Sequence, residues 1–524
     1  MSGNHGLVND AAAANNMTDL EIGPLTSQAG VDQNVEAEAK SAHVVDWAGP
    51  DDAANPRNWS YRHKMVNILL VSLSVFYVNL ATTMFAPGAS VMQREFGYRS
   101  DNVEILTISI ATLGSAVGQL LIPPLSEVFG RRPVYQGSAV FYLGFTVGCA
   151  CSTRVAEFLV FRMLTGVAAS SYMSTGGATI ADLLPREERA VAMALYSSGP
   201  LLGPVLGPIV GGFVTEHLGW RWTFYLILIL ASSITLSHAW YWWPGQPITP
   251  LHSASVVTLA SFFFTRETSA AIILKKKAAR LRRETRNAKL LAAGDQQIPA
   301  GKLLRAALTR PTRILFLSPV VVLMSLLVAV NFGVIILLFS TFPAVFEAEY
   351  HWRVSYTGLA YCGVAVGCAL GVAIFARLGD KLLVRKGPDG RPEERLILMM
   401  WTAPLLPGGL LVYGWTTRYG VHWVVPIVGT SICGLGLVTV GSCAQAYMVD
   451  IFGPDAAASA TGAMSLLRNL AAAFLPLSAP SLYAAVGLGW GNSVLALIAA
   501  LFIPLSFIFY RHGELLRNRF GVKI

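Results

Sequence analysis

Residues 199–212 read GPLLGPVLGPIVGG, a regular run of glycine and proline among apolar residues. Gly-Pro pairs recur every four residues, and the run closes with two glycines: Gly199-Pro200, Gly203-Pro204, Gly207-Pro208 and Gly211-Gly212. In a soluble chain these pairs would indicate repeated turns. Here they lie in an uncharged stretch, residues 190–215, that is long enough to cross a bilayer. Glycine at every fourth position leaves one helix face without side chains, so another helix can approach closely. The prolines remove backbone donors and bend the helix, so the run predicts a membrane helix that packs tightly and pivots.

The composition is that of a membrane protein with many spans. Of the 524 residues, 54% are hydrophobic and 13% are charged, whereas a soluble chain carries roughly 25% charged residues. The mean hydropathy is +0.53. The six cysteines all fall in apolar segments, so they are expected to be small buried residues and not a disulfide framework. We expect no metal site and no cofactor.

Twelve apolar segments reach the length of about 20 residues that crosses the hydrocarbon core. They are residues 65–87, 103–123, 133–152, 156–181, 190–214, 222–243, 314–340, 356–378, 396–416, 423–448, 457–486 and 491–510. The distribution of basic residues supports this count, because cytoplasmic loops carry an excess of Lys and Arg. With both termini cytoplasmic, 31 of the 39 Lys and Arg residues lie inside, and 13 of them fall between Arg266 and Arg313. The net charge of +9 is therefore a topology signal, and it does not indicate nucleic-acid binding.

These spans divide the chain into two bundles joined by a basic linker. We expect a disordered cytoplasmic tail (1–63), a six-helix bundle (64–244), a cytoplasmic linker (245–313), a second six-helix bundle (314–510) and a cytoplasmic C-terminal tail (511–524). The apolar stretch Leu251–Phe264 is too short to span, so it is expected to lie on the membrane surface or to re-enter it. Alternatively, part of residues 232–256 is an insertion, and the sixth span joins residues 225–231 to 257–264.

The two halves have similar residues at corresponding positions. The fourth span ends at Asp182 and the tenth at Asp450. The loop after the second span holds Glu127, Arg131 and Arg132, and the loop after the eighth holds Asp380, Lys381 and Arg385. Two six-helix repeats around a central cavity are the expected architecture of a rocking secondary transporter.

Several motifs carry a resemblance to a known family. They are Leu125–Arg132 (LSEVFGRR) after span two, Phe161–Gly166 (FRMLTG) in span four, the Gly-Pro run in span five, Asn55–Ser60 (NPRNWS) before span one, Arg266–Thr268 (RET) with Lys277–Arg282 (KAARLR), and Tyr447–Asp450 (YMVD) with Arg468. The chain resembles the major facilitator superfamily, and within it the fungal twelve-span drug:proton antiporters. The loop motif departs from the family at Glu127, where Asp is commonest, and at Pro123, where Gly is.

The resemblance implies a charge latch at the cytoplasmic ends of the spans. Its residues are Glu127, Gly130, Arg131, Arg132, Asp182, Asp380 and Asp450. Arg131 would pair with Asp182 in one conformation and separate in the other. The alternative is that the arginines only anchor the chain in the inner leaflet.

Charges inside the spans are the candidates for a proton and substrate pathway. Arg162 and Arg468 lie within spans four and eleven, where a charge is costly and is normally paired or faces a cavity. Snorkelling to the outer interface is the alternative for Arg162. Because no Asp or Glu lies near the middle of a span, the proton-carrying acid is not evident; Asp182, Asp450 and Glu157 are candidates, and uniport remains open.

Polar and aromatic residues within the spans are the candidates for the substrate cavity. They are Asn79, Gln119, Tyr142, Tyr172, Tyr196, Asn331, Tyr361, Gln445, Tyr447 and Asn469. Such groups suit flat amphipathic ligands, although each one could instead form a hydrogen bond between helices.

The resemblance implies an efflux transporter of hydrophobic or amphipathic small molecules, such as a drug, toxin or secondary metabolite. Proton antiport would drive it, and it would act as a monomer in the plasma membrane. A nutrient or polyamine transporter of the same fold is the alternative. No G-x-x-x-x-G-K-[ST] motif is present, which excludes an ATP-driven pump, and we expect the chain not to be an enzyme.

Overall fold

The computed structural model describes residues 44–185, 188–240, 267–288, 290–293, 300–384 and 391–520. A few side chains within these ranges, including that of Asp380, are not described. The chain divides into a larger unit, Trp47–Ile273 with Gln296–Ile524, and a smaller one, formed by residues up to Asp46 and by Leu274–Asp295.

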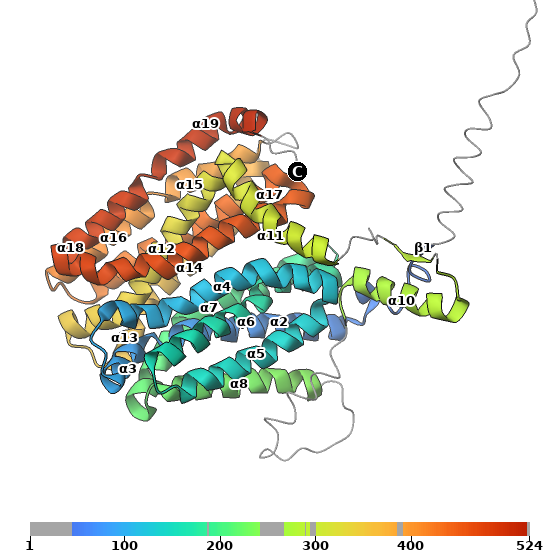
Figure 1. Ribbon diagram of the computed structural model, residues 1–524. Coiled ribbons are helices and arrows are strands. Elements are labelled where there is room, and N and C mark those ends of the chain that lie inside the picture. The colour runs from blue at the N-terminus through green and yellow to red at the C-terminus, as the bar shows by residue number, and fades with distance from the viewer. Residues whose placement is uncertain are drawn as a thin grey trace, which may run out of the picture. The chain divides into compact units, whose positions relative to one another are not determined.

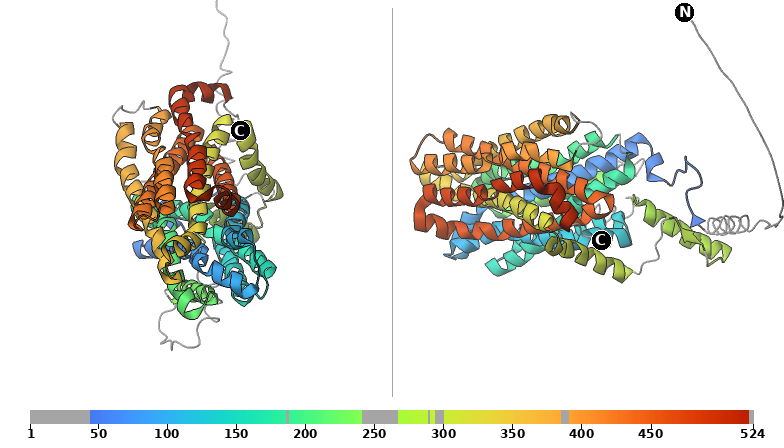
Figure 2. Two further views of the ribbon diagram at one scale, coloured as in Figure 1. Left: turned by 90° about the vertical axis from the view of Figure 1, so that its left-hand side faces the viewer. Right: turned by 90° about the horizontal axis from the view of Figure 1, so that it is seen from above.

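The larger unit is built of helices in two halves. The first half holds η1 (Pro56–Asn58), α2 (Tyr61–Met84), η2 (Ala86–Gly88), α3 (Ala89–Phe96), α4 (Asp101–Phe129), α5 (Arg131–Cys151), α6 (Val155–Leu183), α7 (Arg189–Leu218) and α8 (Arg221–Trp240). The second holds α11 (Ala300–Leu317), α12 (Pro319–Tyr350), α13 (Val354–Thr357), η4 (Gly358–Ala360), α14 (Tyr361–Val384), η5 (Pro392–Arg395), α15 (Leu396–Thr402), α16 (Leu405–Arg418), α17 (Val424–Phe474), η6 (Leu475–Ser478), α18 (Ala479–Ala500) and α19 (Ile503–Phe520). The blue-to-green helices of the first half and the yellow-to-red helices of the second form two groups (Figures 1 and 2).

Helix α17 contains two spans, because it folds back on itself. A straight helix of its 51 residues would be about 76 Å long, more than twice the thickness of the hydrocarbon core. Cys433 near its start and Leu475 just after its end pack into one apolar cluster. Tyr447 and Ala460, from its middle, share another. The chain therefore reverses between Met448 and Ala460, where the sequence predicts the loop between spans ten and eleven.

The described helices confirm the predicted twelve spans. Among the described residues, nine helical stretches are long and apolar enough to cross a membrane. One of them, Ser459–Leu515, holds two spans, because Gly487 adopts a φ of 75° inside α18 and turns the chain. Helix α6 is 29 residues long and rich in Ser, Thr and Gly, and α8, of 20 residues, supplies the sixth span. Residues 241–266, on which the predicted surface segment and the predicted insertion depend, lie outside the described residues.

The glycine face of α7 packs against α2 of the same half. A methyl group on Gly203 would lie 2.7 Å from the Leu80 backbone nitrogen, and one on Gly207 would lie 2.6 Å from the Leu80 oxygen. A methyl group on Gly211 would collide with the carbonyl oxygen of Met84. The four-residue glycine repeat thus joins spans one and five, and it does not itself face the second half.

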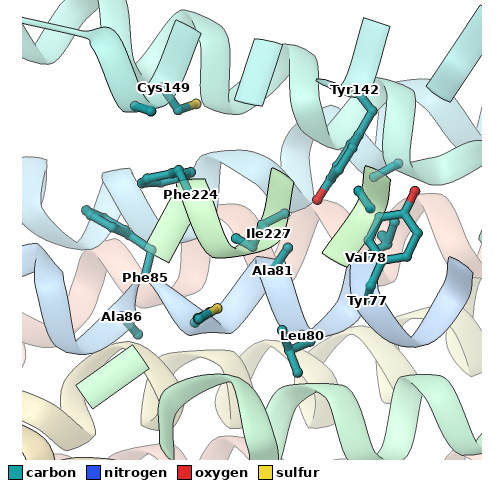
Figure 3. Packing of buried hydrophobic residues seen from close by; sticks show 14 of the residues in the cluster. Tyr77, Val78, Leu80, Ala81, Phe85, Ala86, Tyr142, Cys149, Phe224 and Ile227 are labelled. Carbon is teal, nitrogen blue, oxygen red and sulfur yellow. The ribbon is translucent and has the colours of Figure 1, made fainter. Parts of the chain in front are cut away.

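Aromatic side chains fill the interior of the first half. Phe85 of α2, Phe158 of α6, and Trp220 and Phe224 from the start of α8 are fully or almost fully buried together. Their ring centroids lie 5.0 to 6.2 Å apart. Figure 3 shows Phe85 and Phe224 in this cluster, with Tyr77 and Tyr142 beyond them. Such packing fills the interior of this half without large gaps.

The smaller unit joins the N-terminal segment to the linker. Strand β1 (Val44–Val45) pairs in parallel with β2 (Leu291–Ala292). Lys277, on α10 (Ala270–Thr285), donates from Nζ to the carbonyl oxygen of Asp46 at 3.0 Å. Residues 44–63, which the sequence analysis places in a disordered tail, therefore form β1, η1 and the first turn of α2. Residues 1–43 lie outside the described residues.

Candidate functional site

Arg131 and Asp182 meet where α5 begins and α6 ends. Arg131 Nε lies 3.5 Å from Asp182 Oδ2, and the two side chains are 14% and 26% exposed. Arg131 Nη1 also donates to Ser126 Oγ at 2.6 Å. The structure thus brings together the pair that the sequence suggests. Because both helices belong to the first half, the pair fixes one half internally and does not bridge the two halves.

Glu267 holds the loop before Arg131. Its Oε1 accepts from the backbone N–H of Arg131 at 2.8 Å, and its Oε2 accepts from that of Arg132 at 3.2 Å. A carboxylate at this position satisfies free donors at the start of α5 and is favoured by the helix dipole. Gly130 has a φ of +101°, and a side chain there would collide with the Glu267 carboxylate. Gly130 is therefore required both for the turn and for this contact.

Glu127 does not take part in this contact. It lies exposed on the last turn of α4, although the sequence suggests it as the acid of the latch. Glu267, the acid that contacts the loop, is 136 residues from Arg131 in the chain. No spacing rule predicts such a contact, and the Arg266–Thr268 motif was the only signal that pointed to this residue.

Replacing Glu267 with alanine is expected to lower the thermal unfolding midpoint, because two N–H groups at the start of α5 lose their acceptor. The expected loss is about 1–2 kcal/mol. Glu284→Ala is the matched control, since Glu284 is an exposed linker acid that pairs with Arg280 one turn earlier; its expected loss is below about 0.5 kcal/mol. Equal midpoints for the two variants would contradict a capping role.

The second half has a corresponding pair. Arg395, the last residue of η5, forms an ion pair with Asp450 of α17. Arg395 precedes the predicted ninth span, and Arg131 precedes the predicted third span in the same way. The internal repeat was therefore the signal that could have identified Arg395. The side chain of Asp380 is not described, and Arg385 lies outside the described residues.

Arg162 is locked inside the first half. It is 3% exposed, and its Nη2 donates to the carbonyl oxygens of Ala81 at 3.2 Å and Thr82 at 2.8 Å. Its guanidinium lies 5.8 and 5.5 Å from the ring centroids of Phe85 and Phe224. Arg162 therefore ties α6 to α2, and it does not snorkel to the outer interface.

Glu157 and Arg468 lie in contrasting surroundings. Glu157 is exposed on the first turn of α6, where its Oε2 accepts from Thr153 N and Oγ1, both at 3.3 Å. Arg468, on the second part of α17, is half-buried with its guanidinium 5.0 Å from the ring centroid of Phe332 on α12. Of the two, only Arg468 lies deep within a span.

Most of the proposed cavity residues form contacts within one half. Asn79 and Asn331 donate to carbonyl oxygens one turn back in their own helices, at 2.8 and 2.7 Å. Tyr142 and Tyr172 pack on Tyr77, with centroids 5.7 and 6.1 Å away.

The remaining ones differ in accessibility. The hydroxyl of Tyr196 donates to the carbonyl oxygen of Met173, that of Tyr361 donates to the carbonyl oxygen of Phe339, and Tyr447 is fully buried beside Phe509. Gln445 is exposed and Gln119 half-buried, whereas Asn469 is 5% exposed with its Nδ2 unpaired. Which of them contact substrate stays a prediction.

The two halves meet where the end of α7 contacts α13–η4. A methyl group on Gly212 would lie 2.7 Å from the Val354 oxygen, and one on Gly358 would lie 2.5 Å from the Pro208 oxygen. Glu216 Oε2 accepts from the backbone N–H of Ser355 at 2.8 Å. The end of the Gly-Pro run thus closes the space between the halves on this side, next to the face that packs on α2.

Comparison with known proteins identifies the family. The model of the Major Facilitator Superfamily matches residues 71–476. The chain belongs to this superfamily. It is 49% identical over 492 residues to MFS transporter prlG of Fungal sp. (strain NRRL 50135), covering 93% of this chain and 99% of the relative. It is 44% identical over 494 residues to the "Trichosetin biosynthesis cluster MFS transporter" of Gibberella fujikuroi, covering 94% and 92%.

Solved structures support the same fold for this superfamily member. A crystal structure of a D-xylose-proton symporter matches with a TM-score of 0.62 and 16% identity, covering 85% of this chain and 97% of the symporter. At that identity the match shows the fold alone. Family and fold together make the chain a multi-pass membrane transporter, and not an enzyme.

Proposed function

We propose that this transporter exports a hydrophobic or amphipathic secondary metabolite from a fungal cell in exchange for protons. The observation that carries the proposal is near full-length similarity, at 41–49% identity, to transporters of fungi, one of which is named for a biosynthesis cluster. The Gly-Pro run resembles the signature of the antiporter branch, and its glycines pack α7 onto α2 without intervening side chains.

Export would require the contact between the halves to open on the outer side. The contacts of Gly212 with α13, of Gly358 with α7 and of Glu216 with Ser355 would all have to break. Because each half has a packed apolar interior and its own ion pair, Arg131–Asp182 or Arg395–Asp450, the halves would rock as units. We further propose a plasma-membrane location, cytoplasmic termini, the domain boundaries given above and a monomeric transporter.

The test is reconstitution of the full chain in vesicles that contain a pH-sensitive dye. Trichosetin and the cationic dye rhodamine 123 serve as trial substrates. If transport is proton antiport, an imposed pH gradient drives accumulation of the substrate, by up to about tenfold for each pH unit and proton exchanged. Addition of the substrate also moves protons in the opposite direction. A protonophore and protein-free vesicles are the controls. Equal substrate concentrations on both sides at equilibrium, with no proton movement, would show facilitated diffusion and contradict antiport.

A further inference from the structure

Arg468 is a half-buried cation without a counter-charge among the described residues. The sequence places it eleven residues beyond residue 457, where the eleventh span is predicted to begin, so it lies about 16 Å along the helix, near the middle of a hydrocarbon core about 30 Å thick. Among the described residues its one contact of a polar or aromatic kind is with the ring of Phe332, and its Nε is buried with no hydrogen-bond partner. No described carboxylate faces it. Such a charge costs several kcal/mol, so a protein retains one at this depth for a function.

Two other arginines that lie over aromatic rings differ from Arg468. Arg162 also stacks on aromatic rings, but two carbonyl oxygens of α2 accept from it and it is fully enclosed. Arg418 lies over Trp415, 5.6 Å from its centroid, but it is exposed at the outer end of α16. The Nε of Arg162 also lacks a partner, but only Arg468 combines depth and partial accessibility with no hydrogen bond at all among the described residues. These properties are expected of a ligand-binding group, whereas Arg162 has those of a structural one.

A second unused donor comes from the neighbouring residue. Asn469 is 5% exposed, and its Nδ2 has no hydrogen-bond partner. Just beyond these two residues in the chain, α12 approaches α17 closely, because a methyl group on Gly333 would lie 3.0 Å from Leu475 Cδ2 and 3.2 Å from the Ala471 oxygen. The surroundings thus combine hydrogen-bond donors with apolar and aromatic surface. Buried donors that lack acceptors discriminate strongly in favour of a ligand that supplies them.

We propose that Arg468 binds the acidic group of the exported molecule, and that the substrate is an amphipathic organic anion. This inference rests on the proposed export function and specifies its substrate class. The guanidinium would donate two parallel hydrogen bonds to the acidic group of the ligand, while Phe332 would contact its apolar body. Transporters of this architecture hold their substrates near the bilayer midplane, which is the depth of Arg468.

The test measures binding of two dyes that share a xanthene ring system and differ in charge. The probes are fluorescein, an anion, and rhodamine 123, a cation, and binding to the purified full chain is followed by fluorescence polarisation. Fluorescein is expected to bind at least roughly tenfold more tightly than rhodamine 123, because a charge-assisted hydrogen bond contributes about one to two powers of ten in affinity. Because binding needs no gradient, this result is independent of whether transport is coupled to protons.

Arg468→Gln is expected to weaken fluorescein binding by about tenfold or more and to leave rhodamine binding within about twofold of its original value. Arg468→Lys keeps the charge and is expected to retain an intermediate affinity. Arg418→Gln is the matched control, because it removes an arginine that also lies over an aromatic ring, and it is expected to change neither affinity.

Three outcomes would overturn the proposal. They are equal or tighter binding of rhodamine 123 by the unaltered protein, an unchanged fluorescein affinity in Arg468→Gln, and an equal loss of both dyes in that variant. If Arg468→Gln fails to fold, Arg468→Lys decides: a selective loss of fluorescein affinity supports the anion site, and unaltered selectivity rejects it.

Discussion

Replacing Gly211 with leucine is expected to abolish the folded transporter, whereas the same change at Gly144 is expected to be tolerated. A side chain on Gly211 would collide with the carbonyl oxygen of Met84. Backbone cannot rotate away as a flexible side chain can, so α7 and α2 would have to separate along their whole contact. Overpacking costs about 1–3 kcal/mol where side chains can adjust, and the cost here is expected to exceed that range.

Gly144 is the matched control because it lies exposed on α5, with no other atom within 4 Å of an added Cβ. The measurements are expression as a single, monodisperse species and the thermal unfolding midpoint. We expect Gly144→Leu to behave as the unaltered protein in both, and Gly211→Leu to yield aggregated protein. A monodisperse Gly211→Leu variant with an unchanged midpoint would show that the close approach of α2 and α7 is not required.

Arg131→Gln is expected to leave the protein folded and to slow transport by roughly tenfold. The change removes the ion pair with Asp182 and the bond to Ser126, and hydrogen bonds to charged groups contribute about 1.5–3 kcal/mol. The loss is expected in the transport rate because the loop that holds Arg131 connects two helices of the half that must move as a unit. Uptake into reconstituted vesicles measures it.

A charge exchange separates this role from a general need for positive charge. The double variant Arg131→Asp with Asp182→Arg keeps the pair in reverse and is expected to recover part of the rate that each single change loses. Arg154→Gln, which removes an exposed arginine before α6, is expected to transport normally. If the double variant were no better than either single one, the pair would not be the reason for the loss, and the inner-leaflet alternative would gain support.

The spans could be predicted from the sequence because their length and apolar character are local properties. The loop between spans ten and eleven was predictable in the same way, even though the helix α17 continues through it. The partners of the charged residues are harder to predict, because they depend on contacts between residues far apart in the sequence. The pair of Arg131 with Asp182 followed from a motif, and Arg395 with Asp450 could have followed from the repeat.

Other contacts had no such signal. Glu267 reaches the start of α5 from 136 residues away, and only the folded chain shows that it, and not Glu127, contacts Arg131. The sequence also did not show which helix the glycine face of α7 contacts, since a helix face without side chains can pack against any close neighbour. Likewise, the sequence could locate Arg162 and Arg468 at depth, but it could not show that the first has acceptors and the second has none.

The short pairing of Val44–Val45 with Leu291–Ala292 constrains the order of events during biosynthesis. Because 247 residues separate the paired positions Val44 and Leu291, β1 leaves the ribosome long before its partner does. At a synthesis rate of about 5–20 residues per second, β1 waits roughly 12 to 50 seconds. All six spans of the first half are made in that interval. The pairing can therefore form only after the first half has been synthesised. It can form as soon as the linker emerges, before any span of the second half has left the ribosome.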